Sequence, residues 1–210
     1  MRMRRRRMLF LTITLVTLLA AAGVLLRSQT KASPGVPNTP NSESIQATIR
    51  EAYEIEAHAA HTFDTTKFAS VFINDPRGGE LSPGCLRLVQ DVTGNTSNAA
   101  GYLDYKVAYF SFWERGALQL EELRAKADRE GRALTQEEQM SLMDSSGRSA
   151  APRSPEELGS QTEIRFQSII IDDDTATVVF DDGPRTNKMT LVRAEGKWYI
   201  AGNQVLRVHP

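Results

Sequence analysis

Residues 188–202, KMTLVRAEGKWYIAG, have the pattern of two strands joined by a short charged turn. Apolar and polar side chains alternate before and after the turn, which is the period of a strand with one buried face. Met189 and Leu191 fall on one face before the turn, and Trp198 and Ile200 share a face after it. The stretch therefore predicts an antiparallel hairpin with one side packed on a core.

The same period of two extends back through the last fifty residues. TEIRFQSIII and TATVVFDD, separated by DDD, also alternate, and DGPRTN separates the second of them from the hairpin. Ile164, Phe166 and Ile170 share one predicted face, and so do Ala176, Val178 and Phe180. We therefore predict a four-strand antiparallel meander. Asp172–Asp174 and Asp181–Asp182 would then lie roughly 20 Å apart at opposite ends of one strand, which favours turn chemistry over a calcium site.

Helical periodicity dominates the part of the chain before the meander. A helix that begins near Asn41 or Ser42 places Ile45, Ile49, Ala52, Ala59 and Phe63 on one apolar face. Residues 102–131 predict a long helix with an aromatic stripe made by Tyr102, Tyr105, Tyr109, Phe112 and Trp113. Thr135 and Glu138 form a capping-box pattern that opens a further helix, and residues 85–92 are interpreted as a short strand. Helices followed by an antiparallel sheet define an α+β domain.

Two histidines and a carboxylate in the first helix raise the question of a metal site. Glu54, His58 and His61 share a face, but it is the face opposite the apolar one, so we interpret them as solvated and predict no metal site. Glu56 falls in the middle of the apolar face. A carboxylate there requires a partner or a wet cavity, so Glu56 is either a buried ion-pair partner or a pocket carboxylate.

The N-terminus has the pattern of a membrane anchor. Five arginines within residues 1–7 precede 19 uncharged, mostly apolar residues at 8–26, enough for a helix of roughly 28 Å. The arginines predict a cytoplasmic N-terminus and an extracytoplasmic remainder. Residues 27–41, rich in Pro, Ser and Thr, predict a linker to a domain at 42–210. The alternative is a cleaved signal peptide and a secreted protein.

Charge and cysteine content narrow the possible partners. Six arginines of the 25 basic residues lie at or before position 27, which leaves 19 against 26 acids and a charge of about −7 for 28–210. A domain of that sign is not expected to bind nucleic acid. The single cysteine, Cys85, excludes an intramolecular disulfide and a cysteine-based zinc site. No phosphate-binding glycine loop or nucleophile elbow is present in the sequence, so no cofactor is predicted.

The hairpin around GKWYI, together with the order of elements over residues 42–208, resembles NTF2-like (SnoaL-like, cystatin-related) domains. In that superfamily a Gly-Lys-Trp turn before the last strand recurs often. The resemblance implies a cone-shaped sheet wrapped around the first helix, a pocket between sheet and helices, and dimerisation through the sheet. It also implies that Tyr53, Glu56, Tyr109 and Trp113 face that pocket.

These features lead to two hypotheses about function. The favoured one is a non-catalytic, membrane-anchored module that binds or assembles with an envelope protein or a small apolar ligand. Catalytic members of the superfamily carry an Asp or an Asp–His pair in the pocket, whereas His58 and His61 fall on the outer face here and His209 lies in the tail. The alternative is an isomerase or dehydratase that uses Glu56 as a general base.

Overall fold

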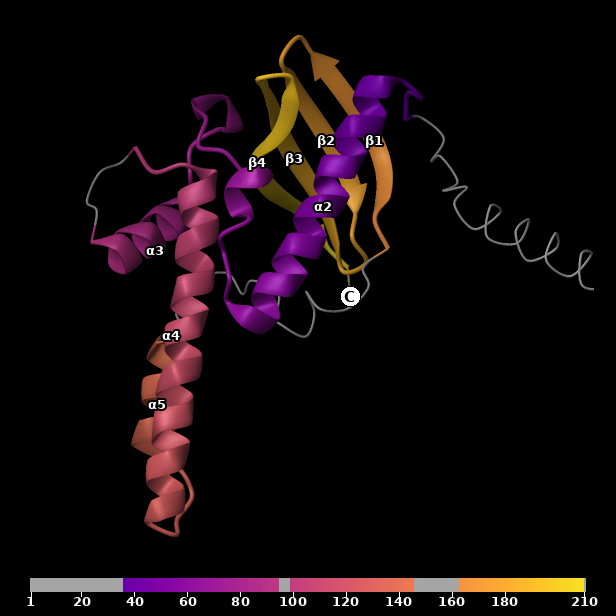
Figure 1. The fold of residues 1–210 in the computed structure, drawn as a ribbon. Helices are drawn as coiled ribbons and strands as arrows, with labels where there is room; N and C mark the ends of the chain where they lie inside the picture. Colours follow the sequence, from indigo (N-terminus) through magenta and orange to yellow (C-terminus); the bar gives the residue numbers. More distant parts are fainter. Residues whose placement is uncertain (1–35, 95–98, 146–162, 210) are drawn as a thin grey trace, which may run out of the picture. The chain divides into compact units, whose positions relative to one another are not determined.

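The computed structural model describes residues 36–94, 99–145 and 163–209. The expected basic tail (1–7) and apolar span (8–26) lie outside these residues, as does most of the expected linker (27–41). None of the helices within the described ranges is long and apolar enough to span a membrane. The described chain is an α+β domain, as predicted, with helices packed against a four-stranded antiparallel sheet (Figure 1).

Helices come first in the chain and strands last. The α-helices are α2 (Pro40–Thr62), α3 (Pro83–Thr93), α4 (Tyr102–Arg129) and α5 (Gln136–Ser145), with short 3₁₀ helices η2 (Phe68–Ser70) and η3 (Pro76–Gly78). The strands are β1 (Arg165–Asp172), β2 (Thr175–Asp181), β3 (Arg185–Ala194) and β4 (Lys197–Val208).

The sheet is the predicted meander, with the strand order β1-β2-β3-β4. Glu195 and Gly196 form the turn between β3 and β4 at φ 52° and 80°, the left-handed conformation that suits a two-residue hairpin. The predicted inward faces are confirmed for three strands, where the buried side chains are Ala176, Val178, Phe180, Met189, Leu191, Trp198 and Ile200.

The prediction for β1 is wrong at one position. The register shifts between Phe166 and Ser168, so Gln167 is an extra residue and the side chains after it change face. Ile169 is therefore the buried residue, while Ile170 is 65% exposed instead of sharing the inner face with Phe166. A single bulge reverses the strict alternation on which the prediction depended.

Helix α2 lies against the sheet with the predicted apolar face buried from Ile45 to Ala59 (Figure 1), whereas Phe63, predicted on the same face, is the half-buried residue that ends the helix at φ 56°. It begins at Pro40, slightly earlier than expected, because Thr39 is the N-cap and its side chain accepts a hydrogen bond from the Ser42 amide. Ile45 and Ile49 are fully buried. Between them, the Thr48 hydroxyl donates a 3.5 Å hydrogen bond to the Trp198 carbonyl, which joins the first described helix to the last strand.

The interpretation of residues 85–92 as a strand is wrong, because they belong to α3. Ser82 caps this helix by accepting from the Cys85 amide, Pro83 occupies its first turn, and Gly94 ends it in the left-handed conformation at φ 69°. Cys85, Leu88, Val89 and Val92 also recur at helical spacing. These start and stop signals outweigh the short apolar run that suggested a strand.

The loop between α2 and α3 covers the start of β4. The Ile200 amide donates to the Val71 carbonyl at 2.8 Å, and the Ile73 amide donates to the Ile200 carbonyl at 3.0 Å. Beyond this bridge, η3 presses on the strand, since a Cβ added to Gly202 would lie 2.3 Å from the Gly78 carbonyl oxygen. Glycine is therefore required where the two backbones meet.

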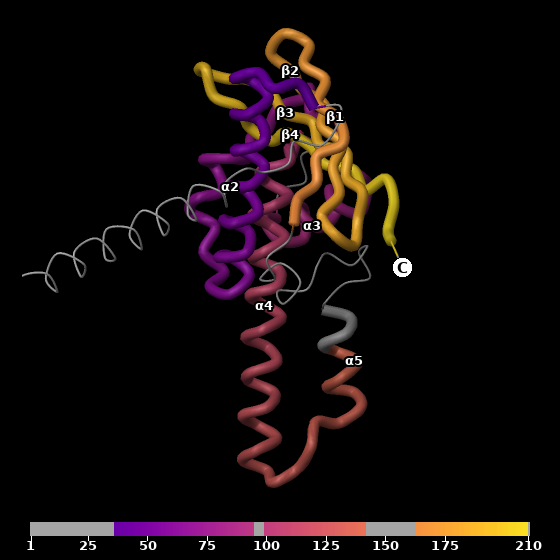
Figure 2. Tube along the Cα trace, turned by 90° about the vertical axis from the view of Figure 1, so that its right-hand side faces the viewer, coloured from indigo at the N-terminus to yellow at the C-terminus, as the bar shows by residue number. Residues whose placement is uncertain are grey.

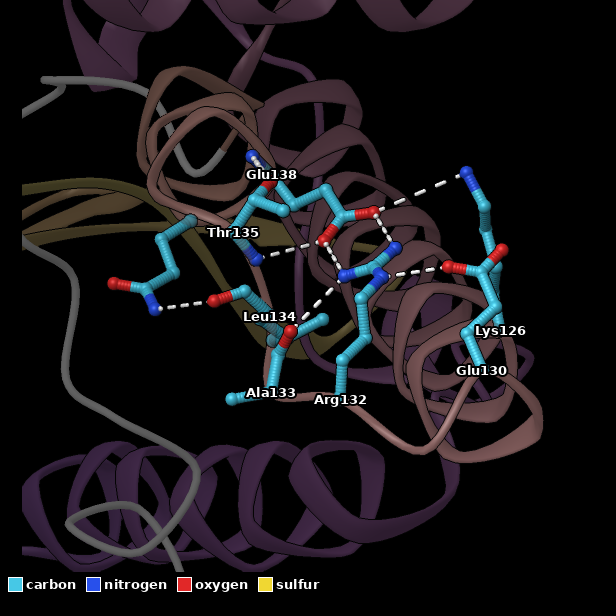
Figure 3. Close-up of polar contacts among 8 residues, drawn as sticks. Lys126, Glu130, Arg132, Ala133, Leu134, Thr135 and Glu138 are labelled. Carbon is cyan, nitrogen blue, oxygen red and sulfur yellow. Dashed lines mark hydrogen bonds and ion pairs between the residues drawn. The ribbon is translucent and has the colours of Figure 1, made fainter.

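Helix α4 runs beyond the sheet, and α5 lies alongside its far half (Figure 2). We refer to residues 114–145 as the arm. The loop at its tip is organised by Arg132, whose guanidinium donates to both carboxylate oxygens of Glu138 at 2.8 Å (Figure 3). The predicted capping box is confirmed, because the Thr135 amide donates to Glu138 and the Glu138 amide donates to the Thr135 hydroxyl.

Candidate ligand-binding pocket

A pocket of about 840 Å³ lies between the helices and the β3–β4 hairpin. The helices contribute Tyr53, Glu56, Cys85, Tyr102, Tyr105, Lys106 and Tyr109. The loop before α3 contributes residues 77–82, and the sheet side contributes Asp182, Arg185, residues 187–190, residues 201–205 and Val208. Of the four residues expected to line a pocket, the structure brings three together here: Tyr53, Glu56 and Tyr109.

Trp113 is not among the lining residues. It lies one turn further along α4, half-buried, with its ring centroid 6.3 Å from that of Tyr109 in an edge-to-face arrangement. Its indole therefore packs against the core and supports Tyr109 rather than facing the pocket. Helical spacing correctly placed Tyr109 and Trp113 on one stripe of α4. The pocket ends at Tyr109, so the next residue of the stripe, Trp113, lies outside it.

Glu56 both lines the pocket and has a charged partner. Its Oε1 lies 2.6 Å from the Lys106 Nζ of α4, and the two side chains are only 12% and 13% exposed. The ammonium also lies 5.4 Å from the centre of the Phe72 ring. Glu56 is therefore both a pocket carboxylate and an ion-pair partner. Its charge on the apolar face of α2 is stabilised by the ammonium of Lys106 on α4.

Three tyrosines of α4 form the wall of the pocket on its helical side. Tyr102, Tyr105 and Tyr109 follow one another at centroid distances of 6.0 and 6.2 Å. Burial raises the pKa of each phenol above its usual value. The hydroxyls therefore stay protonated at neutral pH and can both donate and accept hydrogen bonds.

Asp182, like Lys106, lines the pocket but was not among the predicted site residues. It is 2% exposed. Its Oδ2 accepts from the Tyr53 hydroxyl and from the Asn187 amide side chain, both at 2.7 Å, while its Oδ1 accepts from the Arg185 backbone at 3.1 Å. The network continues weakly from Asn187 to Asn203 at 3.4 Å.

The period of the strand contained the signal for Asp182. Ala176, Val178 and Phe180 point inward, and a period of two continues that face to position 182, whereas Asp181 takes the other face. Asp181 accordingly accepts from Thr186 at 2.6 Å and from Gln167 at 2.8 Å. Treating both aspartates as turn residues overlooked this difference in direction.

The remaining candidates of the first helix lie away from the pocket. His58 and His61 are exposed on the outer face of α2, as predicted. Within the described ranges, no three His, Cys, Asp or Glu side chains are grouped so that they could hold a metal ion. The His209 Nε2 lies 3.0 Å from the Thr186 hydroxyl at the start of β3.

The pocket thus combines aromatic rings, amide side chains and two partnered carboxylates, a lining that can bind and orient a ligand through hydrogen bonds and stacking. The chain matches no family model, no curated protein and no solved structure.

Proposed function

We propose that this domain is a non-catalytic binding or assembly module of the NTF2-like kind, held outside the cytoplasm by a membrane anchor at residues 8–26. The state of the acids inside the pocket carries the proposal. Glu56 is paired with Lys106, and Asp182 already accepts three hydrogen bonds from the protein. A general base needs a lone pair aimed at a substrate proton, whereas partnered groups hold a shape and offer fixed contacts.

The lining favours an amphipathic occupant over a purely apolar one. Tyrosine rings offer apolar faces and protonated hydroxyls, and Asn187 and Asn203 offer amides that both donate and accept. An occupant without hydrogen-bonding groups would displace water from these side chains without replacing the hydrogen bonds that the water made.

Native mass spectrometry of the detergent-solubilised full chain, prepared without a chelator, tests the proposal. Val205 lines the pocket and Ile170 is an exposed isoleucine on β1, so Val205→Trp and Ile170→Trp form a matched pair. We expect a bound component whose occupancy falls about tenfold in Val205→Trp, equivalent to about 1.4 kcal/mol, and is unchanged in Ile170→Trp. The same component at equal occupancy in both variants would contradict binding in this pocket, whereas a chain that carries nothing would exclude a retained small ligand and leave only the assembly role.

A second candidate function follows from the burial of Glu56 within the pocket wall. An isomerase or dehydratase could use this carboxylate as its base if substrate binding displaced Lys106. Glu56→Gln separates the candidates. The binding module predicts a loss of about 3 kcal/mol in unfolding free energy, because Lys106 is left uncompensated, and recovery in Glu56→Gln with Lys106→Met. The enzyme predicts the same loss of stability, because Lys106 pairs with Glu56 in the free protein, but it also predicts a loss of turnover that the double variant does not restore.

The proposed anchor has its own test. Full-length protein should remain in the membrane fraction after a high-salt wash, because apolar burial of residues 8–26 does not depend on ionic strength. Recovery of soluble protein with a shortened N-terminus would instead indicate a cleaved signal peptide.

A further inference from the structure

The two halves of β4 differ in how their outer edge is covered. The first half is bridged at Ile200 by the loop from Val71 to Ile73, and η3 presses on Ala201 and Gly202. From Asn203 to Val208 every residue is exposed, and no strand within the described part of the chain pairs with this edge. An uncovered edge presents a row of backbone donors and acceptors.

Apolar side chains are concentrated on this uncovered end. Val205, Leu206 and Val208 are 43%, 50% and 67% exposed. They make up three of the six large exposed apolar residues in the described ranges, yet all three lie within four consecutive positions. Protected edges are usually short, charged or interrupted by proline, and here Arg207 is the one charged residue of the six. The end of β4 is therefore suited to being covered by another chain.

The register places this edge beside the pocket. Val205 pairs with Asn187 and Val208 with Arg185, and paired residues share a face of the sheet. All four residues line the pocket, so the two valines form its apolar lip. A chain laid along β4 would therefore run past the pocket mouth, with every second side chain directed toward the pocket.

We propose that the free end of β4 binds an extended segment of another protein by strand addition, and that the pocket receives one of its side chains. The inference rests on the proposed binding function and names the class of partner. Backbone hydrogen bonds to residues 203–208 would provide affinity, and the pocket would provide specificity.

The shape of the edge favours a partner segment over a second copy of this chain. Asn187 pairs with Val205 and Thr186 with Arg207, so Leu206 is an extra residue that breaks the alternation. Two such edges related by a two-fold axis through Val205 would place Arg207 opposite Asn203, although these side chains point to different faces. The same axis would place Val208 opposite Gly202, where Gly78 already contacts the strand. A separate peptide avoids both conflicts.

The charges near the edge indicate which residues the partner segment should contain. Arg207 is the one charged side chain of the uncovered edge, on the face away from the pocket. Among the exposed charged residues that line the pocket, Lys188 is opposed by Glu80, and Arg77 is paired with Asp75 at 2.7 Å. The excess of positive charge favours a segment in which acidic residues alternate with apolar ones. The side chain that enters the pocket would be aromatic with a polar tip, to suit the tyrosine wall and the amides.

The probe is a fluorescein-labelled eight-residue peptide that alternates Glu or Thr with Val and carries one central Tyr, titrated with full-length protein in detergent micelles. Two further peptides carry N-methyl groups on the even or on the odd backbone amides. Alternate amides of an added strand point toward its neighbour, so we expect one series to weaken binding at least about tenfold and the other to bind nearly as well as the parent.

Protein variants locate the contact. Arg207→Glu should weaken binding of the parent peptide about tenfold, whereas Arg193→Glu should not, because Arg193 is also exposed but lies at the far end of β3. Amide hydrogen exchange should slow at residues 203–208 when the peptide is present.

Four outcomes would overturn the inference. Equal effects of the two N-methyl series would mean that the peptide does not pair as a strand, and no effect of Arg207→Glu would place it elsewhere. A concentration-dependent dimer that Leu206→Lys abolishes would mean that a second copy covers the edge. No peptide binding, with a pocket component that Val205→Trp removes, would refute strand addition and leave the proposed function standing.

Discussion

The body of the domain and the arm are stabilised by different forces. In the body, α2 and the sheet bury a continuous set of aliphatic and aromatic side chains around Trp198 and Phe180. In the arm, Ala127 is the sole buried residue between Glu114 and Ser141, and the tip depends on the Arg132–Glu138 pair. Apolar burial is cooperative and insensitive to pH, whereas a half-buried ion pair near the surface responds to pH and salt. The arm should therefore open locally while the body stays folded.

The largest expected effect is in the body. Trp198 is 2% exposed, and Trp198→Ala should lower the unfolding free energy by about 3–5 kcal/mol because it leaves a cavity in the core. Urea denaturation followed by circular dichroism measures this change. Tyr199→Ala is the control. Tyr199 is only half-buried, so its removal should lower the unfolding free energy clearly less. Equal losses would mean that the core is not centred on Trp198.

Two glycines allow the same substitution to be compared in the body and in the arm. Gly202→Ala would place a Cβ 2.3 Å from the Gly78 carbonyl oxygen, so we expect a loss of about 1–3 kcal/mol. Gly116 lies within α4 with open space around it, and Gly116→Ala should instead stabilise the helix by about 0.5–1 kcal/mol. Thermal unfolding of both variants checks the opposite signs.

The hydrogen bond from Tyr53 to Asp182 tests the polar part of the body. Tyr53→Phe removes one donor from a buried carboxylate and should cost about 1–3 kcal/mol in unfolding free energy. The double variant with Tyr53→Phe and Asp182→Asn should lose less unfolding free energy than the sum of the losses in the two single variants, because both changes remove the same interaction. Additive losses would show that the two groups act independently.

The smallest expected effect is in the arm and depends on pH. Hydrogen bonds from Arg132 lower the pKa of Glu138 from 4.5 to about 2. The carboxylate is therefore more acidic in the folded arm, so its contribution is complete above pH 4.5 and is lost as the pH falls toward 2. Over this range, the protection factors of the arm amides, which correct for the slower intrinsic exchange in acid, should fall before those of the sheet.

A variant sharpens the same measurement. Glu138→Gln should lower the protection factors of the arm amides at pH 7 to the values that the wild type reaches in acid, and the exposed neighbour change Glu137→Gln should not. A simultaneous loss of protection in arm and sheet would mean that the two regions unfold together.

Elements specified by local patterns were predictable from the sequence. The alternation of apolar and polar residues predicted the four strands, and the helical period predicted the apolar face of α2. The capping-box pattern of Thr135 and Glu138 predicted the start of α5. The errors arose where a single residue changes the local geometry. The bulge at Gln167 exposes Ile170, and the Ser82-Pro83 start makes a helix of an apolar run that resembled a strand.

The pocket was predictable only in part, because its walls come from distant segments. The helical wheel identified Glu56 as an anomaly, but no local pattern could pair it with Lys106, since the two meet only when α2 and α4 pack. Asp182 shows the reverse case. Its inward direction followed from strand period, yet its partner Tyr53 lies 129 positions earlier in the chain.

The hydrogen bond between Thr48 and Trp198 spans 150 positions and has a consequence for synthesis. A ribosome delivers α2 long before β4, so the apolar side of α2, with Ile45 and Ile49, has no sheet to cover it for most of translation. The meander forms from neighbouring hairpins, which close quickly once their residues emerge. The nascent chain therefore completes its core only as its last strand appears, and until then α2 is the segment that a holding chaperone would be expected to shield.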